Sequence, residues 1–208
     1  MNIVLDKVGK RYGFEWIFKN LSFQFDFPQN YAITGPNGSG KSTLLKIICG
    51  QSSPSLGNVY FSQAESPIEN HKVYQLFTIA APYIDLIELF TLKEALAFHK
   101  KFIPIIQNLD INDLIEILGM EQSASKPIQH FSSGMKQRVK LLLALCSNRP
   151  VTLLDEPSTN LDEQGIQWYE NLVAKFGKNK LLIIASNVEN DLKNCQELIN
   201  LKDFKTIK

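Results

Sequence analysis

The stretch GPNGSGKST at residues 35–43 has the composition and spacing of a loop that holds phosphate groups. Gly35, Gly40, Lys41 and Ser42 occupy the fixed positions of the pattern G-x-x-x-x-G-K-[ST]. Glycines let successive backbone N–H groups point at an anion, the lysine ammonium reaches the outer phosphates, and the serine hydroxyl can bind Mg²⁺. A chance glycine-rich turn is a poor alternative in a chain with only 11 glycines. We therefore expect the phosphates of a nucleotide to be held by Gly35, Pro36, Asn37, Gly38, Ser39, Gly40, Lys41, Ser42 and Thr43.

A Mg²⁺ ion held by one serine hydroxyl also needs a carboxylate, and an acidic pair can supply it. Asp155 and Glu156 directly follow the apolar run at 151–154, which predicts a buried parallel strand. Ligands bind at the carboxyl ends of such strands. We expect Asp155 to hold Mg²⁺ through water together with Ser42, and Glu156 to polarise the water that attacks the γ-phosphate. Acidic residues after an apolar run often only begin a loop, so this prediction depends on the phosphate loop.

A second candidate anion site lies at Ser132, Ser133 and Gly134, which precede a helix with an apolar face. A hydroxyl and free N–H groups at a helix N-terminus attract an anion. Ordinary capping of the helix is the alternative. Beside a phosphate loop and an acidic pair, we favour an anion site.

Strands that alternate with helices must position these groups. The pattern predicts strands at 2–5, 21–27, 31–34, 57–62, 73–80, 151–155 and 181–186. It predicts helices at 41–49, 133–147 and 162–176. In the last helix Ile166, Tyr169, Val173 and Phe176 recur on one face, which we expect to cover the sheet. The fold class is therefore α/β, with a parallel sheet flanked by helices.

Residues 83–130 depart from this alternation, because TLKEALAFHKKF and INDLIEILG have helical spacing and no strand lies between them. Thr91 and Glu94 form the T-x-x-E pattern of a capping box. We expect a single domain over 1–208. Residues 1–82 and 134–208 form a core with an N-terminal antiparallel β subdomain, and about 83–133 form an inserted helical subdomain.

Composition narrows the classes of partner. Twenty-two Lys and Arg against 21 Asp and Glu leave a net charge of +1, which argues against a nucleic-acid partner. The start of the chain has no long apolar core, so we expect no signal peptide, and the longest apolar runs are too short to span a membrane. Cys49, Cys146 and Cys195 are widely spaced and predict reduced, buried thiols in a cytosolic protein.

Three segments together carry a resemblance to a known family: GPNGSGKST, FSSGMKQRVKLLLAL at 131–145 and LLDEPSTNLD at 153–162. In this order and spacing the chain resembles, over essentially its whole length, the nucleotide-binding subunit of ATP-binding cassette (ABC) transporters. Its size is similar to that of the compact single-cassette subunits of haem-exporter-like and ABC-2-like systems. The resemblance implies a P-loop fold with ATP and Mg²⁺ as ligands, and ATP hydrolysis coupled to transport.

The resemblance also implies a dimer, either a homodimer or a pair with another cassette subunit. Ser132, Ser133 and Gly134 would cap the γ-phosphate held by the other copy, and Asp162 would link the two sites. Tyr12 would stack on adenine, although a lone Tyr at a turn more often only packs. A separate integral-membrane permease would dock on the apolar stretch 83–90, whose alternative role is packing within the helical lobe. The subunit would then lie on the cytoplasmic face of the membrane.

The chain departs from the family pattern at three places. The usual signature Leu-Ser-Gly-Gly-Gln is here Phe-Ser-Ser-Gly-Met at 131–135, and Ala81 or Pro82 stands where a glutamine is usual. Asn187 replaces a histidine that contacts the γ-phosphate. Asn can donate a hydrogen bond but carries no positive charge, so we expect slow or partner-dependent hydrolysis.

The remaining expectations concern the three histidines and two alternative functions of the protein. His71, His99 and His130 are not placed to replace the missing histidine, and we expect His99 to be solvated on the helical lobe. One alternative is a cassette protein that acts on ribosomes or DNA, which the single cassette and near-zero charge disfavour. Another is a regulatory subunit that binds ATP without hydrolysing it, which the missing Gln and His favour and Glu156 opposes.

Overall fold

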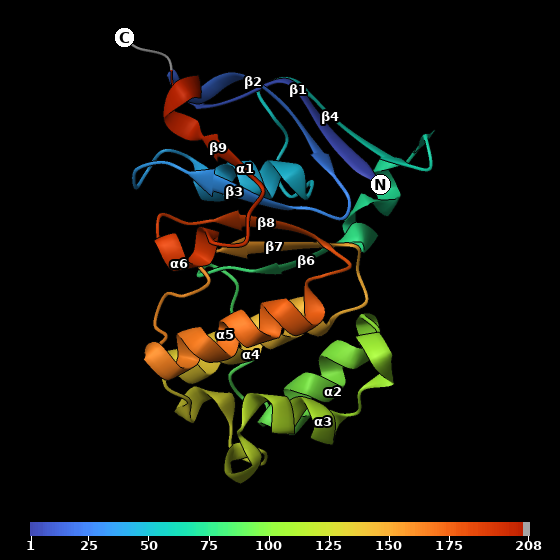
Figure 1. The fold of residues 1–208 in the computed structure, drawn as a ribbon, viewed down its shortest axis with the longest axis vertical. Coiled ribbons are helices and arrows are strands. Elements are labelled where there is room, and N and C mark those ends of the chain that lie inside the picture. Colours follow the sequence, from blue (N-terminus) through green and yellow to red (C-terminus); the bar gives the residue numbers. More distant parts are fainter. Residues whose placement is uncertain (206–208) are drawn as a thin grey trace.

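The computed structural model describes residues 1–205, which form two β-sheets and a layer of helices (Figure 1). The central sheet has five strands in the order β6-β7-β8-β3-β9, and every neighbouring pair is parallel. Its strands are β3 (Asn30–Thr34), β6 (Phe77–Ala80), β7 (Val151–Asp155), β8 (Leu181–Ala185) and β9 (Glu197–Asn200). All residues of β7 and β8 are buried, as the continuous apolar runs predict.

A second, antiparallel sheet has the order β2-β1-β4-β5. It consists of β1 (Asn2–Tyr12), β2 (Glu15–Asp26), β4 (Leu56–Gln63) and β5 (Ser66–Pro67). Helix α1 (Lys41–Ile48) lies between the two sheets (Figure 1). Its apolar side chains share one buried cluster with the inner faces of β1, β2, β7 and β8. This packing fixes the start of α1, and with it the phosphate loop, against both sheets.

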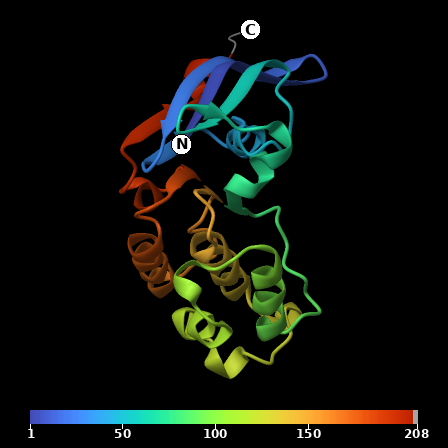
Figure 2. The ribbon, with the colours of Figure 1, turned by 90° about the vertical axis from the view of Figure 1, so that its right-hand side faces the viewer.

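The opposite face of the parallel sheet is covered by α4 (Ser133–Cys146) and α5 (Glu163–Phe176), and α2 (Leu92–Phe102) and α3 (Ile111–Leu118) lie beyond them (Figures 1 and 2). The remaining helices are short: α6 (Glu189–Leu192) and the 3-10 turns Asn70–Leu76, Ile106–Asn108, Glu121–Ser123, Ile128–His130 and Leu201–Phe204. The Thr91–Glu94 capping box begins α2 as predicted. A second box, Asp110 with Asp113, begins α3 and was not predicted.

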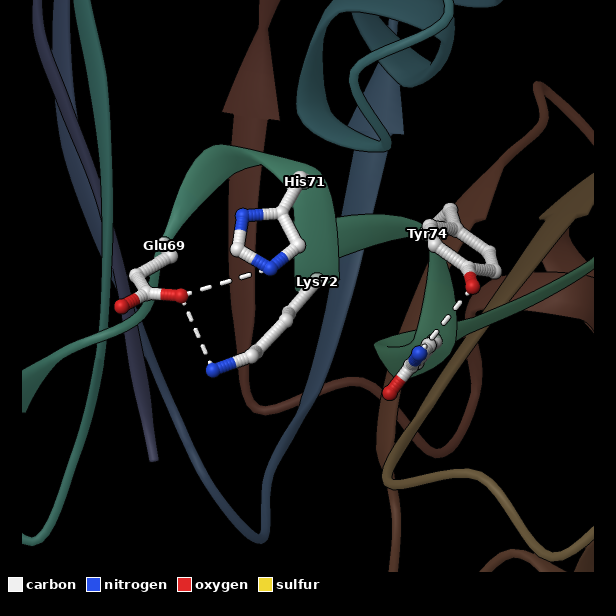
Figure 3. Close-up of polar contacts among 5 residues, drawn as sticks. Glu69, His71, Lys72 and Tyr74 are labelled. Carbon is white, nitrogen blue, oxygen red and sulfur yellow. Dashed lines mark hydrogen bonds and ion pairs between the residues drawn. The ribbon is translucent and has the colours of Figure 1, made fainter.

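The expected α/β fold with a parallel sheet is confirmed, but several boundaries were wrong. The first two strands run much further than 2–5 and 21–27, because each is paired along its length in a long hairpin. The strand expected at 73–80 begins only at Phe77, and residues 70–76 form a 3-10 turn that leaves Tyr74 exposed. Glu69 contacts His71 at 3.4 Å and Lys72 at 2.9 Å in this segment (Figure 3). The apolar residues among 73–76 resemble those of a strand, which explains the wrong prediction.

The sequence pattern did not predict β9 and α6, which complete the C-terminal side of the core. β9 adds to the edge of the parallel sheet beside β3, and α6 connects β8 to it. A strand of four residues and a helix of four residues are too short to produce a hydrophobic period. On α5 the buried face contains Tyr169, Val173 and Phe176 as predicted, whereas Ile166 is only partly buried.

Two expectations about single side chains also need correction. Cys49 and Cys146 are buried free thiols as predicted, but Cys195 is only partly buried. His99 is not solvated: its Nε2 lies 2.7 Å from Ser147 Oγ, at the contact between α2 and the end of α4. Burial lowers the pKa of His99. Within residues 1–205 there is no helix with the length and hydropathy needed to cross a membrane.

Candidate nucleotide site

The phosphate loop connects β3 to α1 and depends on glycine at two positions. Gly35 has a φ of 145° and Gly40 a φ of 102°, a region that other residues rarely adopt. A Cβ at Gly35 would lie 2.6 Å from Ser39 Oγ, and a Cβ at Gly40 would lie 2.4 Å from Ile17 Cγ2. The loop therefore packs so tightly on β2 and on itself that only glycine fits.

The loop borders a hollow of about 240 Å³. Its lining consists of Ile17, Asn37, Gly38, Gly40, Lys41, Ser42, Thr43 and Glu156. Lys41 is 6% exposed, and its Nζ donates to the carbonyl of Gly35 at 2.9 Å. This contact folds the ammonium back over the loop, where its charge and the N-terminus of α1 both favour an anion. The phosphate loop and Glu156, far apart in sequence, thus meet at one place.

Asp155 ends β7 beside the start of α1 and is 1% exposed. Among residues 1–205 neither of its carboxylate oxygens has a hydrogen-bond partner. Burial raises the pKa of Asp155, and the nearby Ser42 hydroxyl and the charges of Lys41 and Lys46 oppose this rise. A buried carboxylate without partners is costly unless it binds a cation. The pair Asp155 and Ser42 therefore fits Mg²⁺, which takes few protein ligands and completes its shell with water and phosphate oxygens.

Glu156 follows immediately and has a φ of 48°, in the left-handed region. Its backbone N–H donates to the carbonyl of Ala185 at 2.8 Å, which holds this turn against the end of β8. Such a conformation costs a non-glycine residue about 1–3 kcal/mol and is concentrated at functional sites. The turn directs Glu156 into the hollow, whereas Asp155 stays in the core.

Asn187, just beyond β8, contacts the phosphate loop directly. Its Oδ1 accepts a hydrogen bond from the backbone N–H of Gly35 at 3.2 Å. Because the oxygen is engaged in this way, the side-chain NH₂ is the group left to donate elsewhere. The position expected for the missing histidine is thus next to the loop, while His71, His99 and His130 lie on other elements.

The residues expected to serve a second copy form a separate group. Ser132 Oγ accepts from the Met135 N–H at 3.2 Å and caps α4, and Asp162 caps α5 through the Gly165 N–H at 2.8 Å. A Cβ at Gly134 would lie 2.8 Å from the carbonyl oxygen of Asn160, so α4 and the loop before α5 touch closely. The described residues that line the hollow do not include Ser132, Ser133, Gly134 or Asp162. These residues therefore do not contribute to the hollow of their own chain.

Comparison with known proteins is decisive for the family. A family model described as "ABC transporter" matches residues 18–159, which is more than half of the chain. The chain belongs to the ABC transporter family.

Relatives and solved structures agree with this assignment. The cytochrome c biogenesis ATP-binding export protein CcmA of Rhizobium etli is 31% identical over 202 residues, covering 95% of this chain and 94% of the relative. The Nod factor export ATP-binding protein I of Burkholderia orbicola is 28% identical and covers 96% of this chain and 67% of the relative. A dimeric bacterial ABC transporter cassette matches with a TM-score of 0.79 and 26% identity, covering 99% of this chain and 97% of that chain. The chain is an ATP-binding and ATP-hydrolysing subunit of this family.

In this ABC subunit Ala81 and Pro82, one of which is expected at the place of the usual glutamine, follow β6. The next residue, Tyr83, lies under Lys46, whose Nζ is 3.8 Å from the ring centroid. Burial and then the charge of Asp155 raise the pKa of Tyr83. Tyr83 and Lys46 thus lie near the acidic pair, and sequence reasoning missed both. Lys46 stands one helical turn after Ser42 on the same face of α1, which was a usable signal.

Of two residues from the first hairpin, Ile17 lines the hollow and Tyr12 does not. Tyr12 ends β1, is 56% exposed, and has Lys10 Nζ 5.3 Å from its ring centroid. One ring face is therefore occupied by a cation, and the ring is not part of the core. Ile17 lines the hollow from β2 and was missed, because only the folded hairpin brings β2 to Gly40.

Proposed function

We propose that this subunit binds ATP with Mg²⁺, dimerises around it, and drives a separate integral-membrane permease from the cytoplasmic face of the membrane. The observation that carries the proposal is the meeting of the phosphate loop and the strained Glu156 at one hollow, with the buried Asp155 beside Ser42 and without a hydrogen-bond partner among residues 1–205. The names of the relatives, which are export proteins, favour export as the direction of transport. Cargo would be selected by the permease.

The residues of the candidate site have separate roles in this proposal. The N–H groups of residues 35–43 and Lys41 bind the phosphates, and Lys41 exchanges its bond to Gly35 for a phosphate oxygen. Ser42 and Asp155 hold Mg²⁺, which when bound neutralises developing phosphate charge. Glu156 accepts the hydrogen bond of the attacking water and orients it. Asn187 donates its NH₂ to the γ-phosphate while its oxygen stays on Gly35, and Tyr12 stacks on adenine.

A second copy, or a paired cassette, completes the site. Ser132, Ser133 and Gly134 would bring the N-terminus of α4 to the γ-phosphate held by the partner, and Asp162 would link the two sites across the dimer. The first turn of α4 contains no acidic residue, which suits an anion. The similar solved cassette is dimeric, which supports a dimer of this subunit.

The permease would dock on the segment after β6. Tyr83, Ile87 and Leu89 are exposed, Leu89 at 79%, so internal packing does not account for these three side chains. Leu86 and Phe90 of the same stretch pack against the helical lobe. It borders an apolar hollow of about 320 Å³. That hollow is lined by Asp85, Leu86, Ile87, Phe90, Ala95, Phe98, His99, Phe102, Ile103 and Leu143.

Leu89→Asp tests the docking cleanly, because Leu89 is exposed and its replacement should not disturb the core. The permease should be recovered from detergent-solubilised membranes with the parent subunit, and not with this variant, while ATP affinity stays the same. Tyr74→Asp, an exposed aromatic on another face, is the matched control. Equal recovery of the permease with parent and Leu89→Asp would contradict the docking surface.

Glu156→Gln tests the chemistry. The variant should bind ATP, form a stable dimer and hydrolyse at least about 100-fold more slowly, in the range expected for loss of a general base. A parent protein that dimerises but shows no more turnover than the variant would instead support the regulatory alternative. A function on ribosomes or DNA is disfavoured by the net charge of +1.

A further inference from the structure

A buried carboxylate outside the hollow joins two of the loops that surround it. Asp191 of α6 is 4% exposed, and its Oδ2 accepts hydrogen bonds from Ser186 Oγ at 2.5 Å and from Ser158 Oγ at 3.0 Å. Its other oxygen has no partner among residues 1–205. Burial raises the pKa of Asp191, and the hydrogen bonds from Ser186 and Ser158 oppose that rise.

Ser186 belongs to the turn that leads from β8 to α6, beside the phosphate loop. Its Oγ also accepts from the Val188 N–H at 3.0 Å, so this hydroxyl shapes the backbone on both sides of Asn187. Asn187 in turn contacts the Gly35 N–H. A movement of Gly35 on binding ATP would therefore be passed to Asn187 and, through the backbone, to the neighbouring Ser186.

Ser158 belongs to the loop between Glu156 and Asp162. Its carbonyl accepts from the Leu161 N–H at 3.1 Å, which closes the turn before α5. On its other side this loop is held by α4, where Gln137 Nε2 donates to the Pro157 carbonyl at 2.8 Å. The loop is thus fastened between α4 and α6, and Asp191 is its attachment to α6.

We propose that Asp191 is a positioning residue that couples ATP on the phosphate loop to the loop carrying Asp162, and so sets the dimer surface. The connected contacts run from Gly35 to Asn187 and Ser186, through Asp191, to Ser158. The proposal rests on the proposed ATP-dependent dimer. In this chain the contacts between the nucleotide site and the proposed dimer surface thus include Asn187, which stands where the family usually has a histidine.

The first test is Asp191→Leu, which keeps the side-chain size and removes the acceptor, in the Glu156→Gln background. ATP affinity of the monomer should stay within about twofold, because Asp191 does not line the hollow. The ATP concentration needed for dimerisation, measured by analytical ultracentrifugation, should rise about 5- to 150-fold, the usual range for coupled sites. Ser147→Ala, which removes a buried hydroxyl elsewhere, should leave both unchanged.

Ser158→Ala and Ser186→Ala provide a second test, which can be carried out even if Asp191→Leu does not fold. Because both hydroxyls act through one oxygen, the double variant should weaken dimerisation little more than the worse single variant. Hydrogen exchange should show that ATP protects residues 157–162 in the parent and not in the double variant.

The outcomes separate this inference from the proposed function. A parent that does not dimerise with ATP refutes the dimer and this inference with it. A parent that dimerises, with variants that dimerise at the same ATP concentration or whose losses are additive, overturns the role of Asp191 alone. Loss of monomer ATP affinity in Asp191→Leu equal to the loss of dimerisation also overturns it, because the residue would then act on the hollow.

Discussion

Replacing Gly40 with alanine should damage the phosphate loop much more than replacing Gly38, although both glycines have a positive φ, of 102° and 77°. The left-handed backbone costs an alanine roughly 1–2 kcal/mol at either position. At Gly38 a Cβ would meet nothing within 4 Å. At Gly40 it would lie 2.4 Å from Ile17 Cγ2 and 3.1 Å from Phe18 Cδ1, so β2 must move away.

The steric part of this cost is that of overpacking, about 1–3 kcal/mol. Gly38→Ala should therefore lower the free energy of unfolding by about 1–2 kcal/mol, and Gly40→Ala by about 2–5 kcal/mol. Urea unfolding measures both, provided that the slope with denaturant is unchanged. Because the backbone at Gly40 begins α1, Gly40→Ala should also weaken ATP binding by about tenfold or more, the equivalent of 1.4 kcal/mol.

A double-mutant cycle with Ile17→Ala isolates the contact. Removing Cγ2 relieves the tightest contact of the new methyl group, so most of the steric part of the Gly40→Ala cost should disappear in the Ile17→Ala background. The backbone part and the 3.1 Å contact with Phe18 should remain. Equal destabilisation by Gly38→Ala and Gly40→Ala would refute the reasoning. So would a Gly40→Ala cost that Ile17→Ala leaves unchanged.

Three further predictions concern single side chains. Asp155→Asn should leave the Mg²⁺-free protein at least as stable as the parent, because an unpaired buried charge is removed, and should abolish the Mg²⁺-dependent gain in ATP affinity measured by calorimetry. His99 has a lowered pKa, so its neutral form is favoured in the fold: its contribution to stability should be full above pH 6.5 and be lost as the pH falls from there toward the folded pKa. His99→Gln should flatten the pH dependence of the free energy of unfolding measured with urea. An unchanged pH dependence in this variant would contradict the role of His99. Asn187→His should raise ATP turnover about tenfold, since a charged donor is stronger than a neutral one, with little change in KM; an unchanged kcat would show that Asn187 does not limit the rate.

Prediction from sequence succeeded where the signal is local. The phosphate loop, the helix that follows it and the buried strand before Asp155 each depend on consecutive residues whose spacing states their structure. The capping box at Thr91 has the same basis. The strand prediction failed at residues 73–76, where the apolar side chains suited a strand, because pairing with β7 begins only at Phe77.

Side chains whose environment is made by distant residues were not predictable. His99 has a helical surface pattern, but the end of α4 covers it, 48 residues away in the chain. Asp191 has an ordinary position in a short helix, and only the fold brings Ser158 and Ser186 to the same oxygen. Tyr83 lies near the acidic pair because the segment after β6 lies against Lys46 of α1, which no spacing encodes.

The sequence by itself predicted the nucleotide chemistry of this protein, because the groups proposed to bind phosphate and Mg²⁺ are short runs of backbone and side-chain groups whose types and order are local. It also determined the parallel α/β class, because buried strands and amphipathic helices alternate along the chain. Only the tertiary structure decided which groups share an environment: Ile17 against Gly40, Asn187 on Gly35, and Asp191 between two loops. These contacts join residues far apart in sequence, so they exist only once the two sheets and the helices have packed around α1.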